Sequence, residues 1–236
     1  MFLSGSMLLK DKITSSTIKY KRQIILKKNG QALGWEVLID SRDLSSKLEK
    51  LARKEIIYNV KYNHSLLKRI IFNLVSSNYE REKLRKKMLF INCNIIDLYD
   101  SSFLDRLLAV NSILSAMQIE LVIEITERKI ELVDNWTLYI ISTLKSLGLK
   151  FAADDYDISG GDFRFRLVKH GLFDFIKVEC EGYDTKKLNG LVISSQGAKL
   201  IIERIETESQ FNEISKCSSV YGLQGYYFGE EESVGI

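Results

Sequence analysis

Two adjacent acidic residues, Asp154 and Asp155, follow an apolar run in the segment AADDYDISGG, residues 152–161. One carboxylate at the end of a strand is usually a helix cap or a turn residue. In this chain the pattern recurs, because several short apolar or β-branched runs end in a side chain that can bind a metal or move a proton. The end residues of these runs are Glu36, Asn92, Glu124, Asp154, Lys177, Glu203 and Gln224.

The oxygen-containing side chains of this series favour hard divalent cations. Mg²⁺ and Mn²⁺ both bind carboxylate and amide oxygens, and the number of acids would allow two ions side by side. Two such ions can hold a phosphodiester and lower the pKa of a bridging water, and Lys177 could orient that water or offset developing charge. The residues therefore predict hydrolysis of a phosphodiester. The oxygen ligands in this prediction are Glu36, Asn92, Glu124, Asp154, Asp155 and Glu203.

An alternation of strands and helices would bring these scattered residues together. The segments between the runs have helical periodicity, as in residues 100–117 and 134–147, and strand-helix-strand units of about 20 to 35 residues force neighbouring strands to be parallel. Seven or eight such units predict a closed α/β barrel, in which the carboxyl ends of the strands meet at one mouth. No linker rich in glycine, serine or proline interrupts the series, which favours a single domain.

The composition gives no sign of bulk binding to nucleic acid or to a membrane. The 236 residues are 45% apolar and 28% charged, and 34 basic against 31 acidic side chains give a net charge of +3. This mixture is typical of a globular protein and excludes an intrinsically disordered chain. Three cysteines without a CxxC pattern indicate neither a disulfide framework nor a zinc site, which favours a cytoplasmic protein. No segment approaches the roughly 18 uncharged apolar residues of a membrane span.

Five segments resemble successive motifs of the EAL domain, the bacterial phosphodiesterase that converts cyclic di-GMP to linear pGpG. They are VIEITERK around Glu124, AADDYD around Asp154, DFIKVE around Lys177, LIIERIETESQF around Glu203 and LQGYYFG around Gln224. GWEVLID stands where that family has its Glu-Ala-Leu signature, and FINCN stands where it has a metal-binding asparagine. The resemblance implies an α/β fold, a TIM-like (βα)8 barrel with an antiparallel first strand. The barrel domain would span residues 18–236, after an N-terminal extension of residues 1–17.

The resemblance also implies roles for individual residues. The metal ligands would be Glu36, Asn92, Glu124 and Asp154, with Asp155 reaching a second metal and Glu203 as a further acid of the metal site. The catalytic set would be Glu36, Lys177, Glu203 and Gln224, in which Lys177 is the catalytic lysine and Gln224 lies near the attacking water. Glu127 would hold the loop that follows Asp155, and Glu206 corresponds to the final acid of the family's Glu-Gly-Val-Glu motif.

Several substrate and loop positions depart from the family pattern. Asp40 stands where the family has an arginine that contacts a substrate phosphate, and Arg22 replaces a glutamine that contacts the substrate. Because these two residues carry opposite charges on facing strands, we expect a salt bridge between them. Asp157 replaces a glycine of the loop after Asp155, which restricts the positive φ angles available there, and Arg204 replaces the glycine after Glu203.

Two functions are compatible with these residues. The chain would either hydrolyse cyclic di-GMP with Mg²⁺ or Mn²⁺, at reduced activity, or act as a catalytically inactive regulator that binds a protein such as a transcription or motility regulator. The complete set of acids favours the phosphodiesterase, because an inactive barrel would be destabilised by keeping clustered acids without metal.

Residues 163–173 resemble the helix after the family's metal-binding loop and are a candidate contact for a homodimer. We expect no sensor or cyclase domain beside the barrel.

Overall fold

The computed structural model describes residues 19–40, 60–126, 133–180 and 185–234. The predicted N-terminal extension, residues 1–17, lies outside the described residues. The strands are β1 (Lys19–Lys27), β2 (Ala32–Asp40), β3 (Met88–Cys93), β4 (Glu120–Ile125), β5 (Lys150–Ala153), β6 (Phe175–Glu179), β7 (Lys199–Glu203), β8 (Val220–Gln224) and β9 (Glu232–Val234).

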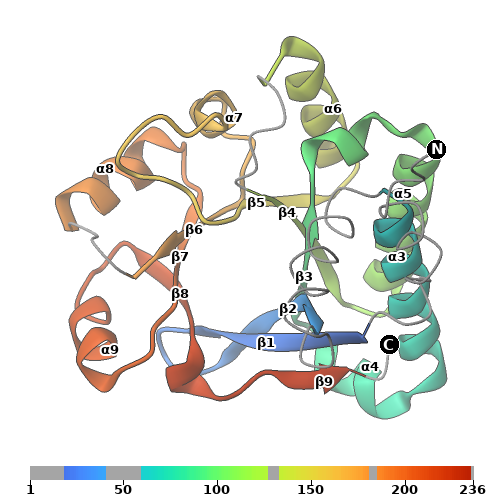
Figure 1. Cartoon of the computed structure of the whole chain (residues 1–236), viewed down its shortest axis with the longest axis horizontal. Coiled ribbons are helices and arrows are strands. Elements are labelled where there is room, and N and C mark those ends of the chain that lie inside the picture. Colours follow the sequence, from blue (N-terminus) through green and yellow to red (C-terminus); the bar gives the residue numbers. More distant parts are fainter. Residues whose placement is uncertain (1–18, 41–59, 127–132, 181–184, 235–236) are drawn as a thin grey trace, which may run out of the picture.

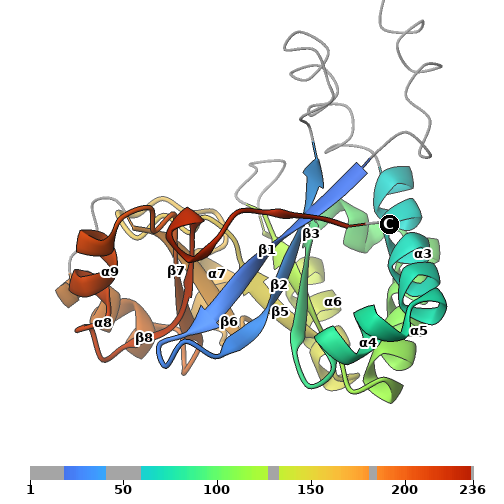
Figure 2. The same cartoon turned by 90° about the horizontal axis from the view of Figure 1, so that it is seen from below.

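Eight of these strands close into a ring, and helices surround it (Figure 1). Strands β2 to β8 are parallel and pair in sequence order, whereas β1 is antiparallel to both of its neighbours in the ring, β2 and β8. The short strand β9 pairs with β1 outside the ring. Figure 2 shows the β1–β2 hairpin running past the neighbouring strands at one end of the barrel. The predicted TIM-like barrel with an antiparallel first strand is therefore confirmed.

The helices begin where the sequence supplies a capping side chain. Asp100 accepts hydrogen bonds from the backbone of Ser102 and Phe103 at the start of α5, and Asp134 accepts one from Thr137 at the start of α6. Among the described helices, none combines the length and the apolar character of a membrane span. The helices are α3 (Val60–Ser76), α4 (Asn78–Leu84), η1 (Ile95–Tyr99), α5 (Ser101–Ala116), α6 (Asn135–Ser146), α7 (Phe165–Lys169), α8 (Thr185–Ser194), α9 (Glu208–Ile214) and η2 (Tyr226–Phe228).

Alternate strand residues face the inside of the barrel and build an apolar layer there. Successive side chains of a strand point to opposite faces, so every second residue of a strand points into the barrel. The rings of Phe90 and Phe175 meet edge to face in this layer, with centroids 5.5 Å apart. The layer fills the barrel below its mouth and forms a floor for the side chains above it. Its members are Ile25, Leu33, Met88, Phe90, Val122, Ala152, Phe175 and Ile201, all buried.

Candidate active site

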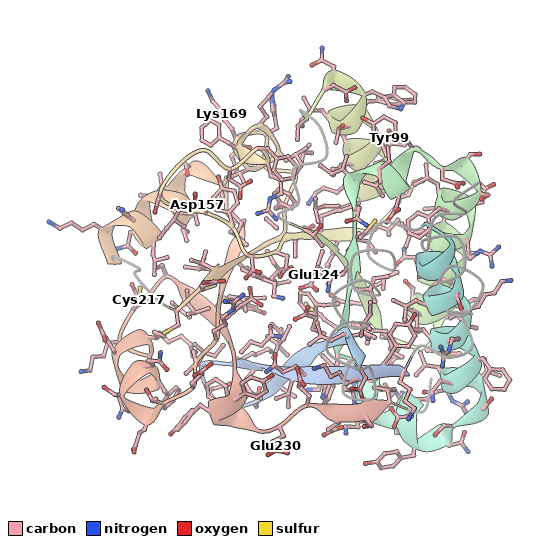
Figure 3. The ribbon with its side chains drawn as sticks, viewed as in Figure 1. Tyr99, Glu124, Asp157, Lys169, Cys217 and Glu230 are labelled. Atoms are coloured by element: carbon pink, nitrogen blue, oxygen red, sulfur yellow. The ribbon has the colours of Figure 1, made fainter. Side chains whose placement is uncertain are left out.

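The side chains predicted to carry chemistry form the next inward layer above this apolar floor. Glu124, for example, follows Val122 by two residues along β4, so both point into the barrel. Figure 3 shows Glu124 near the axis of the barrel, whereas Cys217 lies at its periphery. The period of two thus explains why residues far apart in sequence meet at one level. Asn92, Asp154, Lys177 and Glu203 lie two residues after the floor residues Phe90, Ala152, Phe175 and Ile201.

Lys177 lies at the centre of this layer, and its side chain is fully buried. Its Nζ is 2.9 Å from Glu36, 2.7 Å from Glu124, 3.0 Å from Asp154 and 2.7 Å from Glu203, measured to one carboxylate oxygen of each. Burial alone would lower the pKa of Lys177, but the four carboxylates outweigh it and raise that pKa well above the ordinary value. Lys177 is therefore held as a positive charge among the four acids.

The acids of this layer carry more negative charge than Lys177 neutralises. Oε2 of Glu124 and Oε2 of Glu203 are buried without a hydrogen-bond partner, whereas Oε1 of Glu124 pairs with the Lys177 ammonium at 2.7 Å. Burial raises the pKa of Glu124 and of Glu203 well above the ordinary range, and the negative charges of Glu36 and Asp154 add to this. Because buried carboxylates without partners are costly, this donor set calls for a cation.

Glu36 differs from the other acids because three side chains donate hydrogen bonds to it. Gln224 Nε2 donates at 2.7 Å, Lys177 Nζ at 2.9 Å and Asn92 Nδ2 at 3.1 Å. Burial by itself would raise the pKa of Glu36, but the charge of Lys177 and the bonds from Gln224 and Asn92 lower it below the ordinary value. Glu36 thus stays ionised more readily than Glu124 or Glu203.

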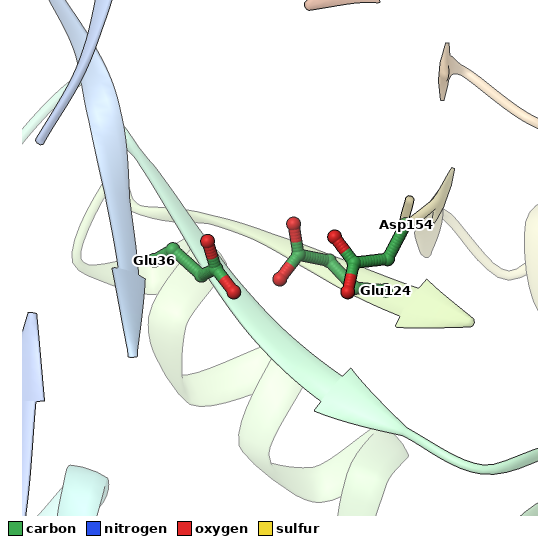
Figure 4. A group of neighbouring side chains, drawn as sticks. All are labelled: Glu36, Glu124 and Asp154. Atoms are coloured by element: carbon green, nitrogen blue, oxygen red, sulfur yellow. The ribbon is translucent and has the colours of Figure 1, made fainter. Parts of the chain in front are cut away.

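Two overlapping groups of acids have the spacing of a metal site. Within each group, one carboxylate oxygen per residue lies within 4.8 Å of the others: Glu36, Glu124 and Asp154 form the first group, and Asp154, Asp155 and Glu203 form the second. Figure 4 shows the three side chains of the first group pointing toward one another. Asp154 belongs to both groups, so two divalent cations bound here would be neighbours. The all-oxygen donor set fits Mg²⁺ or Mn²⁺.

A cavity of about 670 Å³ opens over these acids at the mouth of the barrel. One of its lining residues, Gln23, was missed by the sequence analysis. Gln23 lies opposite Glu36 in the β1–β2 register and accepts a hydrogen bond from Gln224 at 3.0 Å. Gln23 lies two residues before the apolar Ile25 on the same strand, so both side chains point to the same face, and this spacing could have identified Gln23 from the sequence. Of the predicted site residues, Glu36, Asn92, Asp154, Asp155, Glu203, Glu206 and Gln224 line the cavity.

Arg22 does not line this cavity, and the predicted Arg22–Asp40 salt bridge is wrong. The hairpin register places Arg22 opposite Val37. Because Val37 and Asp40 are three residues apart, Arg22 and Asp40 point to opposite faces of the hairpin. Asp40 is on the inner face but does not line the cavity either. On the outer face, the buried Arg22 bonds to Glu80 and Glu232.

Arg164, which the sequence analysis did not identify, holds the loop that follows Asp155. Its side chain is fully buried and donates to the backbone oxygens of Ile125, at 2.6 Å, and of Asp154, and to the carboxylate of Asp162 at 2.9 Å. Ile125 and Asp154 lie at the ends of neighbouring strands, so Arg164 fixes the backbone that carries Asp154. No sequence signal marks this role, because most of its acceptors are backbone carbonyls.

The other residues predicted to shape the loops have mixed outcomes. Glu127, predicted to support the loop after Asp155, lies outside the described residues. Glu206 is exposed at the rim of the cavity. Asp157 has no positive φ angle, because the left-handed angles of the segment after β5 fall on Asp155, at φ 45°, and on Gly160 and Gly161, at φ 110° and 94°. The glycine missing at position 157 is therefore compensated further along the loop.

No protein-family model matches the chain, and no curated protein matches it in sequence. Solved structures of EAL domains match it over nearly its whole length. The PaMucR phosphodiesterase in complex with c-di-GMP is 18% identical with a TM-score of 0.66, covering 92% of this chain and 97% of that one. The FimX EAL domain from Pseudomonas aeruginosa, bound to c-di-GMP, is 19% identical with a TM-score of 0.64, covering 97% of both chains.

A third match has a higher TM-score over a longer protein. The EAL enzyme Bd1971, in a form bound to cAMP and cyclic di-GMP, is 17% identical with a TM-score of 0.74. The match covers 96% of this chain and 65% of that one. At such identities the likeness concerns the fold. The chain has the barrel fold of EAL domains, including the antiparallel first strand.

Proposed function

We propose that this chain is a divergent EAL-type phosphodiesterase that hydrolyses cyclic di-GMP to linear pGpG. The observation that carries the proposal is the buried layer in which four acids surround Lys177, while Oε2 of Glu124 and Oε2 of Glu203 lack hydrogen-bond donors. Such a layer destabilises a barrel that has no ligand for it, because unpaired buried charge is costly. The substrate class is suggested by the comparison structures, since EAL domains of the same fold were solved with c-di-GMP bound.

The roles proposed for the residues follow from their charge and position. A divalent cation, when bound, would polarise the phosphodiester and lower the pKa of the attacking water. Lys177 stays protonated, so it would stabilise negative charge on the phosphate and orient the water instead of removing a proton. Oε1 of Gln224 is buried without a partner and would accept a hydrogen bond from that water. The ligands would be Glu36, Asn92, Glu124, Asp154, Asp155 and Glu203.

The test is incubation of the purified protein with cyclic di-GMP and Mn²⁺ or Mg²⁺, followed by chromatography of the nucleotide. We expect pGpG only when metal is present, and none from Glu124→Gln, which removes a buried carboxylate of the layer. Glu120→Gln is the matched control, because Glu120 is on the same strand but at its exposed opposite end, paired with Lys150. Turnover that survives in Glu124→Gln would place the activity in another site or in a contaminant.

Metal binding can be measured without turnover. A metal that binds only the folded protein stabilises it by about 2.7 kcal/mol at 100 times its dissociation constant, so Mn²⁺ should raise the melting temperature of the wild type. The shift should disappear in Glu124→Gln and persist in Glu120→Gln. A wild type that binds no metal in calorimetry, with or without nucleotide, would contradict the proposal.

A regulator that binds a partner protein is the second candidate. Two substitutions favour it: Asp40 stands where the resemblance places an arginine for a substrate phosphate, so that contact is missing, and Arg204 adds a cation at the rim of the cavity. These changes are also the reason to expect reduced activity in the first candidate. A folded wild type that binds metal and cyclic di-GMP but yields no pGpG would favour the regulator, whose partner could then be sought by affinity capture.

A further inference from the structure

Arg204 is a charged residue in an unfavourable backbone conformation at the edge of the site. It directly follows Glu203, the last residue of β7, and its φ angle of 55° is in the left-handed region that favours glycine. Asp155, which it faces, also has a left-handed φ angle of 45°. Strained backbone of this kind clusters at functional sites.

The guanidinium of Arg204 bridges two acids on neighbouring strand ends. Nη1 lies 2.8 Å from Glu179, the last residue of β6, and Nη2 lies 3.6 Å from Asp155, which follows β5. The Arg204 side chain is 59% exposed, and exposed ion pairs contribute little to stability. Stability therefore does not explain why an arginine stands where the backbone favours glycine.

The position of Arg204 has a direct consequence for the second metal group. Asp155 is one of the three acids of that group, with Asp154 and Glu203, and Oε2 of the buried Glu203 has no hydrogen-bond partner. A cation that binds this group must share the Asp155 carboxylate with Arg204 or displace it. Lys177 contacts all three acids of the first group and two of the second, so Arg204 is the additional cation that distinguishes the second group.

We propose that Arg204 is a tethered cation for the second metal group, which neutralises Asp155 until a divalent ion binds there. This rests on the proposed function, in which the acids of the mouth hold divalent metal. The first group, consisting of Glu36, Glu124 and Asp154, fills first. The second fills at higher metal concentration, because the guanidinium has to leave Asp155 and because its positive charge repels the ion.

Calorimetric titration with Mn²⁺ alone tests this without any measurement of turnover. The wild type should bind one ion more tightly than a second. Arg204→Gly removes the competing charge and suits the left-handed φ angle, so it should tighten the second step roughly tenfold and leave the first within threefold. Arg204→Lys should lie between them, because an ammonium keeps the charge but cannot bridge two acids as a planar guanidinium does.

Lys86→Gly is the matched control for charge and backbone. Lys86 also has a left-handed φ angle, 58°, and is an exposed cation, but it lies just before β3 at the opposite end of the barrel. The Lys86→Gly variant should bind Mn²⁺ with the same two affinities as the wild type. If the wild type binds Mn²⁺ and Arg204→Gly binds it no better, the role of Arg204 is overturned while the proposed function stands. If neither the wild type nor any variant binds Mn²⁺, the role of Arg204 and the proposed function both fail.

Discussion

Two clusters of charged residues, with different balances of acids and cations, lie on the two sides of the β1–β2 hairpin. The inner cluster faces the barrel axis and has four acids around one cation, with buried carboxylate oxygens that lack partners. The outer cluster lies between the hairpin, α4 and β9 and has two cations and two acids. The inner cluster consists of Glu36, Glu124, Asp154, Glu203 and Lys177, and the outer cluster of Arg22, Lys83, Glu80 and Glu232.

The outer cluster stabilises the fold through ion pairs between its own members, whereas the inner cluster has more acids than its cation can pair with. In the outer cluster, Arg22 bonds to both Glu80 and Glu232, Lys83 bonds to Glu232 at 2.6 Å, and the guanidinium lies 5.8 Å from the centre of the Trp35 ring. These groups satisfy one another and need nothing further. The inner cluster has no such balance, which is why metal and substrate are proposed there and not on the outer face.

The largest effect is expected from removing the single cation of the inner cluster. Lys177→Met leaves four buried acids without it, so the metal-free protein should lose roughly 3–5 kcal/mol of unfolding free energy at pH 7. The loss should be smaller at pH 5. The pKa values of Glu124 and Glu203 are already raised by burial, so these acids become neutral on acidification, and the neutral form is the one that the folded state favours.

Urea unfolding at the two pH values measures this, with Lys83→Met as the control in the outer cluster. Lys83 pairs with the half-exposed Glu232, so its removal should cost less than about 1 kcal/mol. Lys177→Met should also abolish formation of pGpG, and Lys83→Met should not. Equal destabilisation by the two variants would remove the distinction between the clusters.

A smaller effect is expected from Arg22, which points to the outer face of the hairpin. It can be compared with its neighbour Gln23, which points into the cavity. Arg22→Met removes bonds to two acids from a buried position and should destabilise the protein by about 1.5–3 kcal/mol. It should not change binding of cyclic di-GMP, because Arg22 points away from the cavity. Gln23→Met should do the reverse, with little loss of stability and weaker binding, because Gln23 lines the cavity.

Urea unfolding and calorimetry with cyclic di-GMP give both quantities, and chromatography of the recovered nucleotide reports any turnover. If Arg22→Met weakened nucleotide binding as much as Gln23→Met does, the substrate role predicted for Arg22 from the sequence would be restored.

The comparison also shows which features could be predicted from the sequence. Glu124, Lys177 and Glu203 were recognised because parallel strands end at one edge of a sheet, so polar residues at strand ends must converge. Their catalytic roles remain predictions. Arg22 was misplaced because a shift of one residue turns a side chain to the other face of a strand, and its neighbour Gln23 was the inward residue.

The remaining features depend on contacts that local sequence does not encode. Arg22 meets Glu80 from α4 and Glu232 from β9, and these segments are far from β1 in the sequence. Arg164 binds mainly backbone carbonyls, which carry no sequence pattern. The bridge from Arg204 to Asp155 and Glu179 joins the ends of three strands. In each case the partner is fixed by closure of the barrel.

The smallest effect concerns the acid side of the outer cluster. The pKa of Glu232 is lowered by a hydrogen bond from Lys83, against an opposing effect of burial, and by a further bond from Arg22. A carboxylate whose folded pKa is lowered stabilises the protein above its unfolded pKa of about 4.5, and that contribution is lost as the pH falls through the folded value.

Because Glu232 is half exposed, its contribution to the free energy of unfolding should be at most about 1 kcal/mol. Glu232→Gln should therefore be slightly less stable than the wild type at pH 7, and the difference should shrink in urea unfolding as the pH falls below about 4.5. A difference that stays constant from pH 7 to pH 3 would mean that Glu232 stabilises by packing alone, and the charge balance of the outer cluster would then not matter for the fold.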